Sequence, residues 1–193
     1  MNIDKKTLIL KAAAKRFARH GVNKTTLYEI ARDLRIGKAT LYHYFNSKLD
    51  IYHEVLEWEK SLYIKDIKAI LDNNETSLVE RFIEYFNFKE ALDEKYKLLY
   101  DTILLLLIEN NQEFEMKFLK SIMEGEEKTI KLILTKIYNK GKTVMEPALP
   151  MFLVLQSWGL LFEKKLYSIS LSETSNKLNT IKMLYKTLEK ILG

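Results

Sequence analysis

The stretch from Thr25 to Lys48, TTLYEIARDLRIGKATLYHYFNSK, decides how this chain can fold. The apolar positions in its first half are Leu27, Ile30, Ala31 and Leu34. Their three-and-four spacing predicts a short helix that buries a single face. Arg35-Ile36-Gly37 then interrupts the period, because Gly loosens the backbone and has no side chain to pack. A second short helix is expected from Lys38 to Phe45.

Two threonines precede the first of these helices. A hydroxyl such as that of Thr25 or Thr26 can act as the N-cap by accepting a hydrogen bond from an otherwise unpaired backbone N–H. With Thr25 as the cap, Tyr28 occupies the N3 position, where a capping box has Glu or Gln. In that register we expect no capping box. The negative charge of Glu29 would then stabilise the helix only through its attraction to the positive end of the helix dipole.

The second helix has one narrow apolar side. Leu41 and Phe45 are aligned at i, i+4 toward a core. The outward side carries Lys38, Ala39, Thr40, Tyr42, His43 and Tyr44. Asn46 and Ser47 are expected to stop this helix and cap the next one. Two short helices joined by a tight turn, the second small at its start and polar along its free face, are typical of a DNA-reading helix-turn-helix.

This region resembles the TetR family of bacterial transcriptional regulators. The matching residues are Phe17, Gly21, Thr25-Thr26, Ile30-Ala31, Thr40-Leu41-Tyr42-His43-Tyr44-Phe45 and Ser47-Lys48. Many positions agree at fixed spacing within roughly the first quarter of the chain, and the remainder matches in length and helical layout. The resemblance implies a homodimer that binds operator DNA, with a cavity in the C-terminal helices where a small-molecule effector releases the DNA.

Three positions depart from the family pattern. Arg35 stands where a turn Gly is common, Gly37 where a Ser cap is common, and Ala39 where Gly is common. A left-handed Arg35 costs about 1–2 kcal/mol, which favours a reshaped turn. We expect these departures to affect operator preference more than family membership.

The composition of the whole chain favours helices. Its 193 residues include two Pro and six Gly, which is fewer of these turn-forming residues than a sheet-rich fold usually needs. Cysteine is absent, which excludes disulfides and thiolate metal sites. The first 20 residues are amphipathic without the apolar core of a signal peptide, and the longest apolar run, Ile103 to Ile108, cannot span a bilayer. We expect a soluble, cytoplasmic, all-α protein that makes no membrane contact.

The charge of the chain is unevenly distributed. Residues 1–48 hold eleven Lys and Arg against three Asp and Glu, a net charge of +8, and the remaining residues hold 20 against 23, a net charge of −3. A basic N-terminal part on a mildly acidic body is expected when only one end of a protein meets phosphate. A solvated, lysine-rich surface is the alternative interpretation.

Two domains and about nine helices are expected. Residues 1–48 would form a three-helix DNA-binding domain, and residues 49–193 a helical effector-binding and dimerisation domain. A long helix over residues 47–71 would link them, either as a lever or as a simple packing helix. Outside the central motif, helices are predicted at Asp4–His20, Ser77–Ala91, Lys95–Glu109, Gln112–Asn139, Pro147–Leu166 and Ser172–Leu192.

The last two predicted helices suggest self-association. Residues 148–162 are apolar on almost every side, so the neighbours within one small domain can cover only part of this helix. Together with the final helix they would form a four-helix interface across a two-fold axis. The candidate interface residues are Met151, Leu155, Phe162, Leu178, Ile181, Tyr185 and Leu188. A monomer with a fully buried central helix is the alternative.

Candidate DNA-binding residues follow from helical position and from the resemblance. Lys38, Ala39, Thr40 and Tyr42 lie near the start of the second motif helix, within reach of base edges. Thr26, Tyr44 and Lys48 are expected to contact phosphates, as the matching family positions do, and Tyr28 and His43 suit either role. For each of these residues plain solvent exposure is the alternative.

A ligand pocket is also implied by the resemblance, and its candidate residues come from the aromatic-rich body. They are Tyr63, Tyr85, Phe86, Tyr100, Asp101, Phe118 and Trp158. Asp101, Glu84 and Glu109 are candidate counter-ions for a lipophilic cation, although a solvated carboxylate is more common. A fatty-acyl or aromatic ligand is an equally open alternative.

No motif of catalysis is present: the three histidines lack metal-ligand spacing, and no phosphate loop, nucleophile elbow or HExxH occurs. We therefore expect no enzyme activity, no cofactor and no metal. The sequence predicts a homodimeric DNA-binding transcriptional regulator, a repressor released from a palindromic operator by a small-molecule effector. The alternative is a helical dimer that binds a small molecule or a protein without reading DNA.

Overall fold

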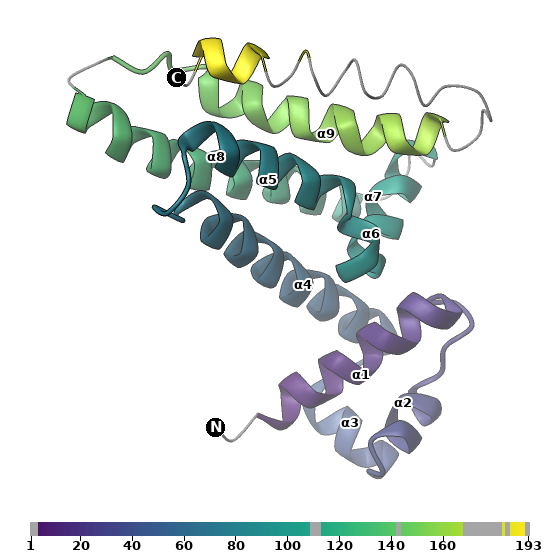
Figure 1. Ribbon diagram of the computed structural model, residues 1–193. Coiled ribbons are helices and arrows are strands. Elements are labelled where there is room, and N and C mark those ends of the chain that lie inside the picture. The colour runs from purple at the N-terminus through teal and green to yellow at the C-terminus, as the bar shows by residue number, and fades with distance from the viewer. Residues whose placement is uncertain (1–3, 109–112, 142–143, 168–182, 184–185, 192–193) are drawn as a thin grey trace. The chain divides into compact units, whose positions relative to one another are not determined.

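A computed structural model describes residues 4–108, 113–141, 144–167, 183 and 186–191. Every regular element within these residues is a helix, which confirms the predicted all-α fold (Figure 1). The helices are α1 (Lys5–His20), α2 (Leu27–Asp33), α3 (Lys38–Tyr44), α4 (Lys48–Leu71), α5 (Leu78–Glu90), α6 (Leu92–Lys95), α7 (Lys97–Ile108), α8 (Glu113–Gly141) and α9 (Leu149–Tyr167). Residues 186–191 are also helical. Most of the predicted helix Ser172–Leu192 lies outside the described residues.

The chain forms two compact units. The first contains residues 1–63 and 96–111, and the second contains residues 64–95 and 112–193. Helix α4 contributes its first sixteen residues to one unit and its last eight to the other. The predicted division into domains of residues 1–48 and 49–193 stays a prediction.

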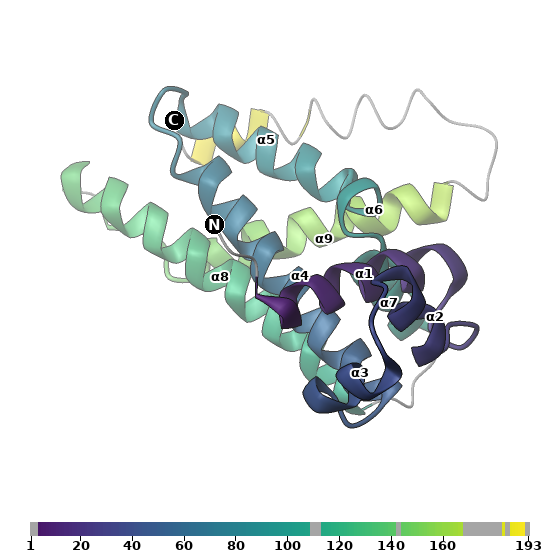
Figure 2. The ribbon, with the colours of Figure 1, turned by 90° about the horizontal axis from the view of Figure 1, so that it is seen from below.

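The first unit is built on the amphipathic helix α1. Its apolar stripe is buried at Ile9, Leu10, Ala13, Ala14 and Phe17. Helix α1 packs against α2 and α7, and α2 packs against α3; Figure 2 shows these helices from below. Gly21 ends α1 at φ 80°, a left-handed conformation that favours glycine. The predicted end of the first helix is therefore confirmed.

The second unit centres on α9, which packs against both α5 and α8 (Figure 1). Helix α5 begins with a capping box in which Ser77 and Glu80 exchange hydrogen bonds with each other's backbone N–H. Its buried face presents Phe82, Tyr85 and Phe86 to the core. The core of this unit thus joins three helices that are far apart in the sequence.

One predicted helix boundary is wrong. The sequence suggested a helix that begins at Lys95, but Lys95 is the last residue of the short helix α6. Helix α7 starts separately at Lys97, and the buried carboxylate of Glu59 accepts the N–H of Leu99 in its first turn at 3.0 Å. A partner from α4 satisfies the start of α7, so no local capping residue marks it in the sequence.

Candidate nucleic-acid interface

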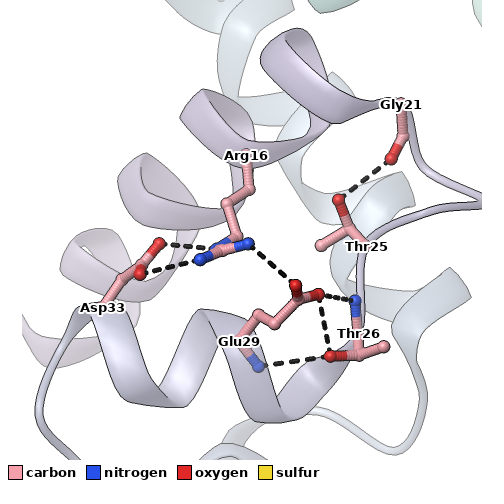
Figure 3. Close-up of polar contacts among 6 residues, drawn as sticks. All are labelled: Arg16, Gly21, Thr25, Thr26, Glu29 and Asp33. Atoms are coloured by element: carbon pink, nitrogen blue, oxygen red, sulfur yellow. Dashed lines mark hydrogen bonds and ion pairs between the residues drawn. The ribbon is translucent and has the colours of Figure 1, made fainter.

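Helix α2 begins with a complete capping box. Thr26 is the N-cap: its hydroxyl accepts the N–H of Glu29, whose carboxylate accepts the backbone N–H of Thr26 at 2.8 Å (Figure 3). The expectation of a Thr25 cap without a capping box is therefore wrong. Thr25 is buried instead, and its hydroxyl donates to the carbonyl of Gly21 at 2.9 Å. This hydrogen bond holds the Thr25 side chain at the end of α1, so the next residue, Thr26, is the N-cap of α2.

Arg16 joins α1 to α2. Its guanidinium donates two hydrogen bonds to Asp33, Nε to Oδ2 at 2.6 Å and Nη2 to Oδ1 at 2.9 Å, and its Nη1 lies 3.3 Å from Oε1 of Glu29 (Figure 3). The Arg16 side chain is 14% exposed. Bidentate pairing of this kind fixes orientation as well as distance. Arg16 therefore holds α2 in register with α1.

These contacts shift the pKa values of the groups involved. The hydrogen bond from Arg16 lowers the pKa of Asp33, and the backbone N–H of Thr26 lowers the pKa of Glu29. Both carboxyls therefore stay ionised at neutral pH. Arg16 was not predicted, although Glu29 and Asp33, spaced i, i+4 on one face of α2, were a usable signal for a basic partner.

The turn between α2 and α3 contains a residue in the left-handed conformation. Arg35 has φ 54°, so the expected reshaping of the turn does not occur. The N–H of Ile36 reaches back to the carbonyl of Ala31 at 3.0 Å and closes the end of α2. Gly37 is the N-cap of α3 without a side-chain hydrogen bond, as expected for a Gly at a Ser position.

One face of helix α3 is buried and the opposite face is exposed. Leu41 and Phe45 are buried, as their spacing predicted. Tyr42, on the free side, is 49% exposed, and the Lys38 ammonium lies 5.5 Å from the centre of its ring. The Ser47 hydroxyl then accepts the N–H of Asp50 at 3.0 Å and caps α4 as predicted.

The nine predicted DNA-binding residues all lie in the first unit. Six are exposed and three are half-buried; the exposed set is Thr26, Tyr28, Lys38, Ala39, Tyr42 and His43, and the half-buried set is Thr40, Tyr44 and Lys48. The Lys48 ammonium donates to the carbonyls of Val22 and Asn23 at 2.8 and 3.3 Å, so it also holds the α1–α2 loop.

The predicted pocket residues are divided between the two units. Tyr63, Tyr100 and Asp101 belong to the first unit, and Tyr85, Phe86, Phe118 and Trp158 to the second. Of the candidate counter-ions, Asp101 pairs with Lys97 at 3.0 Å, Glu84 is exposed, and Glu109 lies outside the described residues.

A buried ionic cluster in the second unit was not predicted. Lys89 on α5 and Glu126 on α8 are both fully buried, and their Nζ and Oε1 atoms lie 2.6 Å apart. Glu126 falls four residues after Ile122 and four before Ile130, on the same buried stripe of α8. A carboxylate inside an apolar three-and-four pattern is the signal that could have revealed it.

The predicted dimer face lies partly within the described residues. On α9, Leu155 is 52% exposed, Met151 and Phe162 are half-buried, and the neighbouring Phe152 is 40% exposed. Leu188 is buried and helps to line a groove beside α9. The other residues that line this groove are Phe152, Leu153, Gln156, Leu160, Met183, Thr187 and Ile191. Leu178, Ile181 and Tyr185 lie outside the described residues.

The described residues contain neither a metal-binding cluster nor a membrane-spanning helix. No cluster of three His, Cys, Asp or Glu residues there has the arrangement of a metal site. In the same part of the chain, no helix combines the length and apolar character that crossing a membrane requires.

The geometry of α2 and α3 defines a class of protein. Two short helices joined by a left-handed turn, packed on α1 and presenting the free face of the second helix, form a helix-turn-helix. Residues 9–55 match the family model of bacterial regulatory proteins, tetR family. This match places the helix-turn-helix region of the chain in the TetR family, whose members are transcription regulators.

Individual relatives align with this chain over different lengths. The HTH-type transcriptional regulator YhgD of Bacillus subtilis is 35% identical over 72 residues, which is 37% of this chain and 36% of YhgD. The chain thus matches only about a third of the length of that relative. IcaR of Staphylococcus aureus, negative transcriptional regulator of the biofilm operon icaADBC, is 26% identical over 96% of this chain and 100% of its own length.

Solved structures show the same fold over the full length. FadR of Bacillus subtilis in complex with stearoyl-CoA aligns with a TM-score of 0.64 at 18% identity, covering 98% of each chain. At this identity the likeness concerns the fold alone.

Proposed function

We propose that this protein is a sequence-specific transcriptional repressor that binds a palindromic operator as a homodimer. The observation that carries the proposal is α3, which buries Leu41 and Phe45 while exposing Lys38 and Tyr42 at the start and middle of the helix. Residues near the start of a recognition helix are those that reach base edges in the major groove. The relative IcaR is a negative regulator, which favours repression.

Charge supports the same proposal. The basic excess, a net charge of +8, lies within residues 1–48, the segment that contains α1, α2 and α3. Lys5, Lys11, Lys15 and Arg19 are exposed on α1. Such side chains neutralise phosphates, which sets affinity and salt dependence but carries no sequence information.

A homodimer is needed because one recognition helix covers only a few base pairs. Two copies held about 34 Å apart would read both halves of a palindrome in successive major grooves. The exposed apolar side chains of Phe152 and Leu155 on α9 suit a surface covered by a second copy.

An effector site in the second unit is the remaining part of the proposal. A ligand releases DNA only if it binds one conformation of the dimer better than the other. FadR, which shares the fold, holds stearoyl-CoA, so this architecture accommodates a small molecule. A regulator of this kind acts in the cytoplasm, without a cofactor or catalytic step.

The test is a fluorescence-anisotropy titration against the promoter of the protein's own operon, at several salt concentrations. We expect specific binding that weakens steeply with salt, since each phosphate contact adds about one to the slope of log K against log salt. Tyr42→Ala should abolish specific binding while sedimentation still shows a dimer. Lys131→Ala, an exposed change on α8, is the control and should bind as the wild type does.

Two results would contradict the proposal. If Tyr42→Ala binds the operator like the wild type, α3 is not the recognition helix. If the wild type binds promoter and random DNA equally at all salt concentrations, the protein is a helical binding module that does not read DNA.

A further inference from the structure

The buried cluster of the second unit contains one cation and the groups that hold it. Besides the ion pair with Lys89, the Glu126 carboxylate accepts a hydrogen bond from the Tyr85 hydroxyl at 2.6 Å and one from Trp158 Nε1 at 3.2 Å. The Ser157 hydroxyl lies 2.8 Å from that of Tyr85. Helices α5, α8 and α9 each contribute, so the cluster lies where the three helices of the core meet.

The surroundings of the Lys89 ammonium are those of a recognition site for organic cations. Its Nζ atom lies 3.9 Å from the centre of the Trp158 ring and 2.6 Å from Oε1 of Glu126. An indole face together with a carboxylate is the usual environment for a bound ammonium, because the ring quadrupole and the negative charge both attract it. Here the chain's own lysine fills the place of the ligand.

Holding this lysine inside the core is costly. Burial lowers the pKa of Lys89 to about 8, even though Glu126 acts in the opposite direction. Buried ion pairs often contribute little net stability compared with apolar side chains of similar volume. A cluster that costs this much and joins three helices is better explained by a role in switching than by a role in stability.

Lys89 is the partner that a ligand can replace. It lies in the last turn of α5, next to the final residue Glu90, and its long flexible side chain can turn toward the helix end. There the negative end of the helix dipole attracts a cation. Glu126 lies in the middle of the 29-residue helix α8 on a shorter side chain, so it stays in the core.

We propose that the second unit binds an organic ammonium compound, an aliphatic amine or a quaternary ammonium, whose charged head displaces Lys89 from between Glu126 and Trp158. This inference rests on the proposed function, since it names the chemical class of the effector. Displacement removes the contacts of Lys89 on α5 with Glu126 on α8 and Trp158 on α9, and leaves the hydrogen bond of Tyr85 to Glu126 as a remaining polar link between α5 and α8. That change gives the effector the preference for one conformation that release of DNA requires.

The experiment uses the full-length chain and two probes of equal size. n-Propylammonium chloride has the charge and length of the lysine atoms removed in Lys89→Ala, and 1-propanol is its neutral counterpart. Ionic strength is held constant with sodium chloride. Binding is followed by Tm and by Trp158 fluorescence in a Trp58→Phe background, neither of which depends on DNA. A failure here therefore differs from a failure to bind the operator.

We expect n-propylammonium, and not 1-propanol, to raise the Tm of Lys89→Ala and to change its Trp158 emission saturably. The wild type should respond to the same probe with an apparent Kd about tenfold weaker or more, because Lys89 occupies the site most of the time. The double variant Lys89→Ala, Glu126→Gln keeps the space but loses the carboxylate, and it should lose the response. If Lys89→Ala is unfolded alone, n-propylammonium should restore its helical circular dichroism.

Five outcomes would overturn the inference. The first is an equal response to both probes, and the second is an unchanged response in the double variant. The third is a wild type that shows no saturable response up to about tenfold above the Kd of Lys89→Ala. The fourth is an unfolded Lys89→Ala that stays unfolded in the probe. A response to propionate in place of the amine would show that an anion takes the position of Glu126, and would equally overturn the proposal.

Discussion

Replacing Glu59 by Gln should stabilise the protein above neutral pH and leave it almost unchanged in acid. Glu59 on α4 is 6% exposed, and its pKa is raised to about 7. Burial is the main cause and the charge of Asp101 adds to it, whereas the N–H of Leu99 acts in the opposite direction. The folded protein therefore holds a proton on Glu59 that the unfolded chain has already released.

The magnitude follows from linkage. With a folded pKa of about 7 and an ordinary value of 4.5, the folded state binds more protons between these two pH values, so stability falls as pH rises through this window. The full loss above pH 7 is about 3 kcal/mol. Gln stays neutral at all pH values, and the hydrogen bond of the charged carboxylate with Leu99 is already contained in the pKa of about 7. We expect a net gain of about 3 kcal/mol at pH 8.

Urea unfolding at one protein concentration, from pH 4 to pH 8, measures this effect. The wild type should lose stability relative to Glu59→Gln as the pH rises through the window. Glu57→Gln is the matched control, because Glu57 lies on the same helix with an exposed side chain paired to Lys60. A difference between Glu59→Gln and wild type that does not change with pH would refute the reasoning.

Three further changes probe the first unit, each measured as a change in the free energy of unfolding. Thr26→Ala removes the α2 cap and should cost about 1 kcal/mol, whereas Thr26→Ser should stay close to wild type; equal losses would disprove the capping role. Gly21→Ala should cost about 1–3 kcal/mol through its backbone (φ 80°, ψ 154°) alone, since a Cβ there meets no atom within 4 Å. Arg35→Gly should relieve about 1 kcal/mol of left-handed strain, less the added entropy of the unfolded chain, and a clear loss of stability would show that the arginine side chain has an unseen partner.

Local patterns in the sequence were sufficient for the helix-turn-helix. The apolar spacing of α1, the left-handed Gly21 and the Ser47 cap all depend on residues within one or two turns of each other. Hydrophobic periodicity and capping operate over such distances, so one sequence reveals them. The capping box of α2 was missed by a single residue, because Thr25 and Thr26 are chemically equivalent caps and only the bond of Thr25 to Gly21 separates them.

An all-helical chain with a basic helix-turn-helix at its start could therefore be predicted from the sequence, because periodicity, capping and charge depend on residues that are close together in the chain. The tertiary structure alone decided that Arg16 joins Glu29 and Asp33, that Glu59 caps α7, and that Lys89 meets Glu126 in the core. These partners are 13 to 40 residues apart, and a charged side chain does not indicate its partner until packing has removed the water around both.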